Sequence, residues 1–366
     1  MDKIWLKNYP ANVKHEIDPN EYASLTDLLT RAFQHHGDSP FSVCMERWMT
    51  YRELDQLSQA LGAWFQAQGL KPDDRVALML PNIPQFAVTM AAILRAGYTC
   101  VNVNPLYTAR ELEHQLKDSG ASAIVILENF AHTLAEVIEH TQIKHTVLAS
   151  MGDLLGPVYG RWITFAVRHL AKMVPEFELP LGDHHKVTSF KDAIAAGRHL
   201  SFKAVPQTLD DIAFLQYTGG TTGLSKGAVL THRNIVAAIL QAETWFAPAL
   251  ERLPDLRKVN SIAALPLYHI FALTLCFLAI RQGSHLTLVP NPRDFAKFIE
   301  TLKKRPFHLL PGVNTLFNAL LQHPMFKTVD FSNLCLTQAG GMAASEGTAR
   351  AWQAEIGRAS CRERVS

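Results

Sequence analysis

The sequence predicts the α/β fold class, with two doubly wound and mostly parallel sheets. Short apolar runs alternate with capped amphipathic segments along the chain, a rhythm typical of βαβ units. The runs are apolar throughout instead of alternating with polar residues, which indicates strands covered on both faces. The rhythm occurs before residue 150 and again after residue 206, and a chain of 366 residues is long enough for two cores.

The first half of the chain contains clear helix signals. Residues 50–53 and 108–111 have the Thr-x-x-Glu pattern of a capping box, so each opens a helix, and Gly69 and Gly120 end these helices. Further helices are predicted over 83–95 and 131–140, and strands over 75–80, 98–103, 123–127 and 145–148. We expect these elements to form a first subdomain over residues 1–150.

The second half repeats the pattern after an irregular connecting segment, 151–205. A strand over 211–217 leads into a glycine-rich loop, and a short strand over 228–230 leads out of it. Later strands are predicted near 259–265, 284–289, 307–310 and 333–337. We therefore expect a second subdomain over 206–354 that carries the loop, followed by a tail over 355–366.

Composition excludes few classes of function. Charged residues make up 19% of the chain and the formal net charge is +2, which gives no argument for a nucleic-acid partner. The five cysteines have no Cys-x-x-Cys spacing, so neither a zinc site nor a disulfide framework is indicated. The first residues are charged and lack an apolar core, so we expect no signal peptide and a cytoplasmic location.

An uncharged stretch over 261–280 has two interpretations. Its length could span a bilayer as a helix, which would favour a membrane transporter. However, Pro266 would interrupt that helix and His269 would lie near its middle. A buried strand, a turn containing proline and a buried helix explain the stretch better.

The most informative segment is the loop over 217–228, Tyr-Thr-Gly-Gly-Thr-Thr-Gly-Leu-Ser-Lys-Gly-Ala. Glycines let backbone N–H groups approach an anion, hydroxyls add neutral donors, and Lys226 adds a positive charge. This combination suits a polyphosphate, and the plainer alternative is a polar hairpin tip. The loop is not a P-loop, because Lys226 follows Gly223 by three residues and strands flank the loop on both sides.

The loop resembles the phosphate-binding signature of the adenylate-forming enzymes, which include acyl-CoA synthetases, luciferases and the adenylation domains of peptide synthetases. Other segments are similar to those of bacterial long-chain fatty acid–CoA ligases. These segments are Ile4–Pro10, Asn102–Tyr107, Arg110–Leu116, Leu265–Leu273 and Pro311–Asn318. The resemblance extends over almost the whole chain. The loop is specific to the superfamily, and the other segments point to the subgroup.

This resemblance implies a two-step reaction. ATP and a fatty acid form an acyl-adenylate and pyrophosphate, and the thiol of coenzyme A then forms a thioester and AMP. The first step gathers negative charge, so it needs cations and aligned dipoles. Fatty acid, ATP and coenzyme A are the expected partners, Mg²⁺ is the expected cofactor, and a homodimer stays open.

The resemblance also assigns site residues. The phosphates of ATP would be bound by Tyr217, Thr218, Gly219, Gly220, Thr221, Thr222, Gly223 and Lys226. Thr218 is the candidate ligand of Mg²⁺. Gly340 and Gly341 would pack against the adenine ring, with a plain strand-to-helix turn as the alternative.

Tyr268, His269 and Phe271 would line the acyl pocket. A lone histidine in an apolar run is usually a core residue, but the surrounding motif favours a position beside the reacting carboxylate, so His269 is a candidate catalytic residue. The catalytic lysine of the family is expected in a further C-terminal domain, and Lys226 is not that lysine. We therefore expect this chain to be an N-terminal fragment that is inactive alone.

Two further segments carry open alternatives. Residues 161–174 predict a basic amphipathic helix, which either packs on its own domain or makes peripheral contact with the inner membrane. Residues 355–366 resemble a translated sequencing adapter, with a genuine polar tail as the alternative.

Two alternatives to a long-chain ligase also stay open. Medium-chain, aryl and fatty acyl–AMP ligases share the loop and differ in the acyl pocket. A non-catalytic nucleotide- or acyl-binding module is the alternative from another class.

Overall fold

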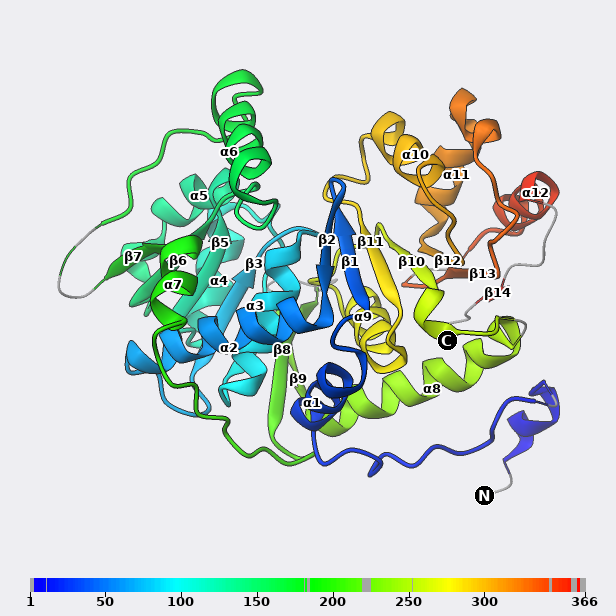
Figure 1. Cartoon of the computed structure of the whole chain (residues 1–366), viewed down its shortest axis with the longest axis horizontal. Helices are drawn as coiled ribbons and strands as arrows, with labels where there is room; N and C mark the ends of the chain where they lie inside the picture. The colour runs from blue at the N-terminus through cyan, green and yellow to red at the C-terminus, as the bar shows by residue number, and fades with distance from the viewer. Residues whose placement is uncertain are drawn as a thin grey trace.

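Two sheets lie side by side in the computed structural model (Figure 1), which describes residues 3–10, 12–180, 182, 185–218, 225–251, 253–341, 344–356 and 361–362. Among these residues each sheet has seven strands, and each contains one antiparallel pair at an edge beside otherwise parallel neighbours. The predicted α/β class with two mostly parallel sheets is confirmed.

The first sheet has the strand order β7-β6-β5-β3-β4-β8-β9. Its strands are β3 (Arg75–Met79), β4 (Thr99–Asn102), β5 (Ala123–Leu127), β6 (His145–Ala149), β7 (Lys186–Ser189), β8 (Ile212–Thr218) and β9 (Lys226–Thr231). Alternate residues of one strand enter separate cores, as Val76 and Ala77 do, so both faces are buried. One core includes α2 (Tyr51–Ala67), α3 (Pro84–Arg95) and α7 (Phe190–Gly197), and the other includes α4 (Ala109–Ser119) and α5 (Ala131–Ala135).

The second sheet has the strand order β14-β13-β12-β10-β11-β1-β2. Its strands are β1 (Pro40–Cys44), β2 (Arg47–Thr50), β10 (Asn260–Ala263), β11 (His285–Leu288), β12 (Leu309–Gly312), β13 (Leu336–Ala339) and β14 (Cys361–Arg362). Its helices are α1 (Leu25–His36), α8 (His232–Leu250), α9 (Ile270–Gln282), α10 (Phe295–Lys303), α11 (Asn314–Gln322) and α12 (Glu346–Ile356). The predicted tail boundary at residue 355 falls inside α12, and β14 pairs with β13.

The sheets do not follow the predicted subdomain boundaries. β1 comes from the first 150 residues but pairs in the second sheet, where Ser42 lies beside Leu286 of β11. β8, which was expected in the second subdomain, pairs in the first sheet, where Phe214 lies beside Cys100 of β4. Local patterns predict a strand but not its partner, so the exchange was not visible in the sequence. The glycine-rich loop therefore belongs to the first sheet.

The predicted helix signals are largely confirmed. Both capping boxes form, with the side chains of Thr50 and Thr108 accepting hydrogen bonds from the backbone N–H groups of Glu53 and Glu111. The predicted helix over 131–140 is shorter, because α5 ends at residue 135 and a separate 3₁₀ turn follows.

The uncharged stretch over 261–280 divides into β10 and α9, joined by a turn that contains Pro266, as predicted. Within the described ranges, no helix combines the length and the apolar composition that crossing a membrane would need.

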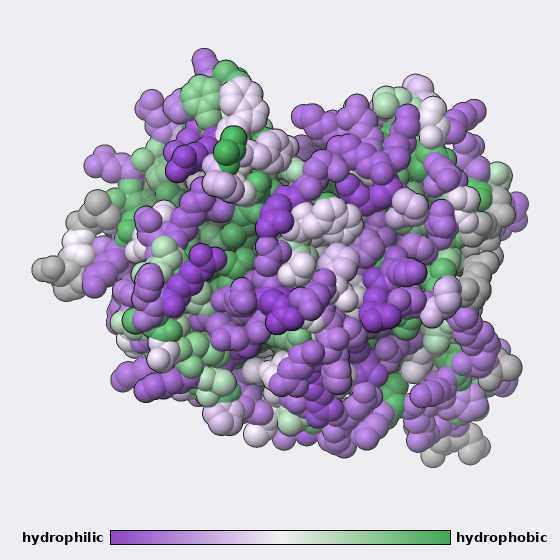
Figure 2. Space-filling model, in the orientation of Figure 1, coloured by the Kyte–Doolittle hydropathy of each residue, from purple (hydrophilic) through white to green (hydrophobic). Residues whose placement is uncertain are grey.

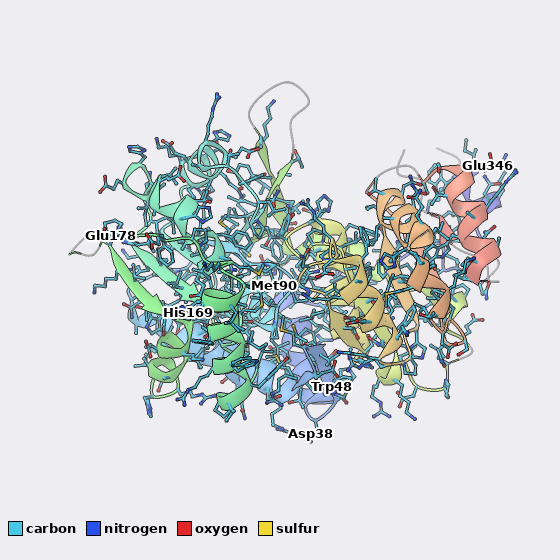
Figure 3. The ribbon with its side chains drawn as sticks, turned by 90° about the horizontal axis from the view of Figure 1, so that it is seen from above. Asp38, Trp48, Met90, His169, Glu178 and Glu346 are labelled. Carbon is cyan, nitrogen blue, oxygen red and sulfur yellow. The ribbon has the colours of Figure 1, made fainter. Side chains whose placement is uncertain are left out.

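A continuous core joins the two halves of the molecule. Met90 of α3 is fully buried and lies near the centre (Figure 3). The rings of Phe214 in β8 and Phe277 in α9 make an edge contact, with centroids 6.2 Å apart. α1 also packs against both α3 and α9, so helices from the two halves share one core.

The predicted basic amphipathic helix forms only in part. α6 (Pro157–Phe165) continues as a π-helical turn over Ala166–Leu170 and then ends. A π turn changes the angular spacing of side chains, so the helical wheel does not describe residues beyond Phe165. Arg168 donates to the buried carboxylate of Glu128 at 2.7 Å, which ties the segment to the first sheet.

Candidate functional site

The loop predicted to bind phosphate connects β8 and β9. Its residues Gly219, Gly220, Thr221, Thr222 and Gly223 lie outside the described part of the chain. Thr218 and Lys226 are directly opposite each other at the ends of the two strands, and both are exposed. Opposite residues in an antiparallel pair project from the same face, so a hydroxyl and an ammonium group together flank the loop entrance.

The side chain of Tyr217 is buried, whereas that of the neighbouring Thr218 is exposed at the loop entrance. The Tyr217 side chain is 7% exposed and its hydroxyl donates to Oδ2 of Asp118 in α4 at 2.5 Å. Burial and the nearby carboxylate raise the pKa of Tyr217, so the phenol stays protonated. Gly227, opposite Tyr217, leaves room for the ring, because a Cβ there would lie 2.9 Å from it. Tyr217 therefore anchors the hairpin through its hydroxyl group, which leaves only the backbone of Tyr217 to contact a phosphate.

Gln216 connects the hairpin to the second sheet. It lies two residues before Thr218 and therefore on the same face of β8. Its Nε2 donates to the carbonyl oxygen of Tyr268 at 3.1 Å, and its Oε1 accepts from Nδ2 of Asn102 at 3.2 Å. Sequence reasoning missed Gln216, although an amide inside an apolar strand is a recognisable signal.

Asn82 makes a second connection that sequence reasoning missed. This buried side chain follows β3 and donates through Nδ2 to the carbonyl oxygens of Ala263 and Leu265, both at 2.8 Å. Its Oδ1 accepts from the backbone N–H of Leu267, also at 2.8 Å. Asn82 thus fixes the turn that precedes Tyr268. The available signal was a Pro-Asn pair directly after a strand.

The predicted acyl and adenine residues meet in one cavity of about 230 Å³. Tyr268, His269, Phe271, Gly340 and Gly341 all line it. The remaining lining residues are Leu265, Pro266, Ala272 and Val313. Two segments that are about seventy residues apart in sequence, the start of α9 and the end of β13, therefore form a single site.

His269 is the N-cap residue of α9, and its Nδ1 accepts a long hydrogen bond of 3.5 Å from the backbone N–H of Phe271. Desolvation lowers the pKa of His269, so the imidazole is neutral near pH 7. The side chain is exposed to the cavity and is not a core residue. A neutral imidazole can donate or accept a hydrogen bond here without adding a charge.

The two glycines form an open face of the same cavity. Gly341 has a φ of +73°, and an added Cβ there would meet no atom within 4 Å. Gly340 donates its N–H to the carbonyl oxygen of Gly312 at 3.2 Å, which holds the turn against β12. A flat ring could approach this backbone closely.

The chain is similar to known proteins over most of its length. The family model described as AMP-binding enzyme matches residues 29–363. A protein of Yersinia pestis named long-chain-fatty-acid–CoA ligase is 46% identical over 360 residues, and one of Salmonella typhimurium with the same name is 47% identical over 354 residues. These alignments cover 98% and 96% of this chain, and the chain spans 62% of the length of each relative.

Solved structures share the fold. An anthranilate CoA ligase in complex with anthranoyl-AMP has a TM-score of 0.76 at 20% identity, over 94% of this chain and 60% of that one. A long-chain-fatty-acid–CoA ligase from Archaeoglobus fulgidus has a TM-score of 0.70 at 21% identity, over 94% of this chain and 64% of that one. With the family match over most of its length, the chain belongs to the AMP-binding enzyme family.

Proposed function

We propose that the protein is a long-chain fatty acid–CoA ligase that works through an acyl-adenylate. The observation that carries the proposal is the shared cavity, in which the residues expected to hold a carboxylate and those expected to hold adenine lie together. The 46–47% identity to relatives with this name supports the choice of substrate. An acyl-adenylate joins both groups in one molecule, so a site that binds it must bring these two sets of residues together.

The proposed roles follow from position. Backbone amides of the loop, together with Thr218 and Lys226, would hold the phosphates of ATP. The fatty carboxylate would lie beside neutral His269, which can hydrogen-bond one carboxylate oxygen while the other attacks the α-phosphorus. The P–O bond to pyrophosphate breaks as the new bond to the acyl oxygen forms. The thiol of coenzyme A would then attack the acyl carbon and release AMP.

The residues present fit Mg²⁺ delivered with the nucleotide. In the described part of the chain, no group of three His, Cys, Asp or Glu side chains could hold a metal by itself. Mg²⁺ usually keeps its waters and binds phosphate oxygens with one or two protein oxygens, and the exposed hydroxyl of Thr218 is a suitable one. The ion would neutralise charge on the phosphates during adenylation.

Binding of a stable acyl-adenylate analogue to this chain tests the proposal. Palmitoyl-sulfamoyl-adenosine, measured by calorimetry, is expected to bind more tightly than ATP or palmitate, because one molecule makes both sets of contacts. A benzoyl analogue is the matched probe for the aryl alternative. Preference for the benzoyl compound, or no binding of either, would overturn the long-chain assignment.

We also propose that the protein, acting on the cytoplasmic side, contacts the membrane through α6. Val158, Trp162, Phe165 and Leu170 are exposed, and Trp162 and Phe165 stack on each other at a centroid distance of 6.0 Å. Figure 2 displays apolar residues at the top of the lobe that carries α6. The basic character of the segment suits an anionic lipid surface.

Vesicle co-sedimentation tests this contact. Replacing Trp162 and Phe165 by serine is expected to weaken binding to phosphatidylglycerol vesicles by roughly tenfold or more, because two large apolar groups no longer leave water. Leu106→Ser, at an exposed apolar residue outside α6, is the matched control and should change nothing. Equal binding of the double variant and the parent protein would show that α6 is not the contact.

A further inference from the structure

One helix, α4, is bonded to both arms of the hairpin that β8 and β9 form. Nε2 of His114 lies 2.9 Å from the carbonyl oxygen of Ser225, the residue directly before β9. Asp118, four residues further along α4, accepts the hydrogen bond from the hydroxyl of Tyr217 in β8. Residues four apart lie on the same face of a helix. A single face of α4 therefore holds the hairpin on both sides of its loop.

The direction of the hydrogen bond between His114 and Ser225 follows from its atoms. A carbonyl oxygen can only accept, so Nε2 of the imidazole carries the proton and donates it. A second group reaches the same residue from the connection that leads into α4. Burial raises the pKa of Tyr107, and a hydrogen bond with the side chain of Ser225 opposes this rise. The backbone and the side chain of Ser225 are thus both bonded to the segment that contains α4.

α4 is a firm support for these bonds. Leu112 and Leu116 are fully buried in one core of the first sheet. Nε2 of the buried Gln115 donates to the carbonyl oxygen of Asn102, at the end of β4, at 2.8 Å. The capping box fixes the first turn of the helix. α4 therefore cannot shift without breaking buried contacts to the first sheet.

The strand β9 needs support from outside its own sheet. It is the last strand of the first sheet, so it pairs only with β8. Among the described residues, the pair nearest the loop is Thr218 with Lys226. The end of an edge strand opens more readily than a strand with two neighbours. The bond from His114 fixes the backbone one residue before Lys226 and so opposes this opening.

We propose that α4 positions the hairpin for the β- and γ-phosphates of ATP, with His114 as the positioning residue. Its bond to Ser225 keeps Lys226 opposite Thr218, so the ammonium group and the hydroxyl group meet the phosphates together. A strand end that is held in advance does not have to be ordered when the nucleotide binds, which improves affinity. The inference rests on the proposed function, because the hairpin must bind the phosphates of ATP. It also gives a role to the segment 110–116, which contributes nothing to the 230 Å³ cavity.

Calorimetric titration of the purified chain with ATP and Mg²⁺, and separately with palmitoyl-sulfamoyl-adenosine, tests the inference. The second ligand has no β- or γ-phosphate, so it reports on the rest of the site. His114→Ala should weaken ATP binding by roughly three- to tenfold, the effect of one lost hydrogen bond, and leave binding of the analogue within about twofold. His114→Gln keeps an N–H group at the end of the side chain and should restore ATP binding.

Two further variants complete the test. His140→Ala is the matched control, because His140 lies 3.5 Å from the carboxylate of Glu113 in the same helix and its side chain is 62% exposed. It should alter the binding of neither ligand. Tyr217→Phe removes the other bond between α4 and the hairpin but keeps the buried ring, so this variant should fold even where His114→Ala does not. It should also weaken ATP binding and spare the analogue.

The outcomes separate the two proposals. Parent-like ATP affinity in His114→Ala or Tyr217→Phe, an equal loss for ATP and the analogue, or no recovery in His114→Gln would overturn the positioning role and leave the ligase proposal intact. Failure of the parent chain to bind either ligand would overturn the proposed function itself.

Discussion

Replacing Asn82 by alanine is expected to destabilise the protein by about 2 kcal/mol or more. The side chain is 3% exposed and makes three hydrogen bonds of 2.8 Å to the turn that precedes His269. The carbonyl oxygen of Ala263 would keep its hydrogen bond from the backbone N–H of Val289, but alanine would remove the partner of the Leu265 carbonyl oxygen and of the Leu267 N–H group. Each such group costs about 1–3 kcal/mol, so two give a lower bound of about 2 kcal/mol. That is a large share of a typical stability of about 5–15 kcal/mol.

Urea unfolding, analysed by linear extrapolation, measures the cost. Asn129→Ala is the matched control, because Asn129 is 8% exposed and its Nδ2 donates to a single carbonyl oxygen, that of Met173, at 2.9 Å. It should lose about 1–3 kcal/mol. The folded Asn82 variant should also bind the palmitoyl-adenylate analogue more weakly, since the start of α9 is no longer held. Equal destabilisation by the two substitutions would refute the reasoning.

Two further predictions concern buried groups away from the loop. Burial lowers the pKa of His232 from 6.5 to about 4, so the unfolded chain takes up a proton before the folded one. The stability that His232 contributes is complete above pH 6.5 and is lost as pH falls from there towards 4. Urea unfolding at a series of pH values measures the slope of the free energy of unfolding against pH, and His232→Gln should reduce that slope. An unchanged slope would contradict the assignment. Gly312→Ala should cost about 1–3 kcal/mol in the same assay, because its Cβ would lie 2.5 Å from the buried ring of Phe317. Gly347→Ala, at an open position in α12, should be neutral or slightly stabilising, and similar losses in both variants would rule out the steric explanation.

Local sequence patterns predicted the elements well, because caps and apolar runs act within a few residues. The Thr50 and Thr108 caps, the division of 261–280 into strand and helix, and the fold class are all confirmed. Strand partners were not predictable in this way. Pairing of β1 with β11 depends on residues more than two hundred positions apart, and no local sequence pattern predicts it.

The site was predicted by residue type but not by its connections. Tyr268, His269 and Phe271 do share a cavity with Gly340 and Gly341. The supporting amides, Gln216 and Asn82, were missed because their partners are backbone carbonyls of distant segments, and a backbone carbonyl has no signature in a sequence. Tyr217 was assigned to the phosphate-binding loop, and its side chain lies towards α4 because side chains alternate along a strand.

The exchange of strands between the sheets affects how the protein can be made. A ribosome adding about 5–20 residues per second synthesises β1 roughly 10–50 s before β11, because Ser42 must wait for Leu286. During that interval the apolar strand has no neighbour on that side, while the first sheet can complete itself once β9 emerges. The nascent chain therefore presents an unpaired edge that a chaperone could protect. Slowing of translation between residues 50 and 285 is expected to lower the yield of folded protein more than slowing after residue 290.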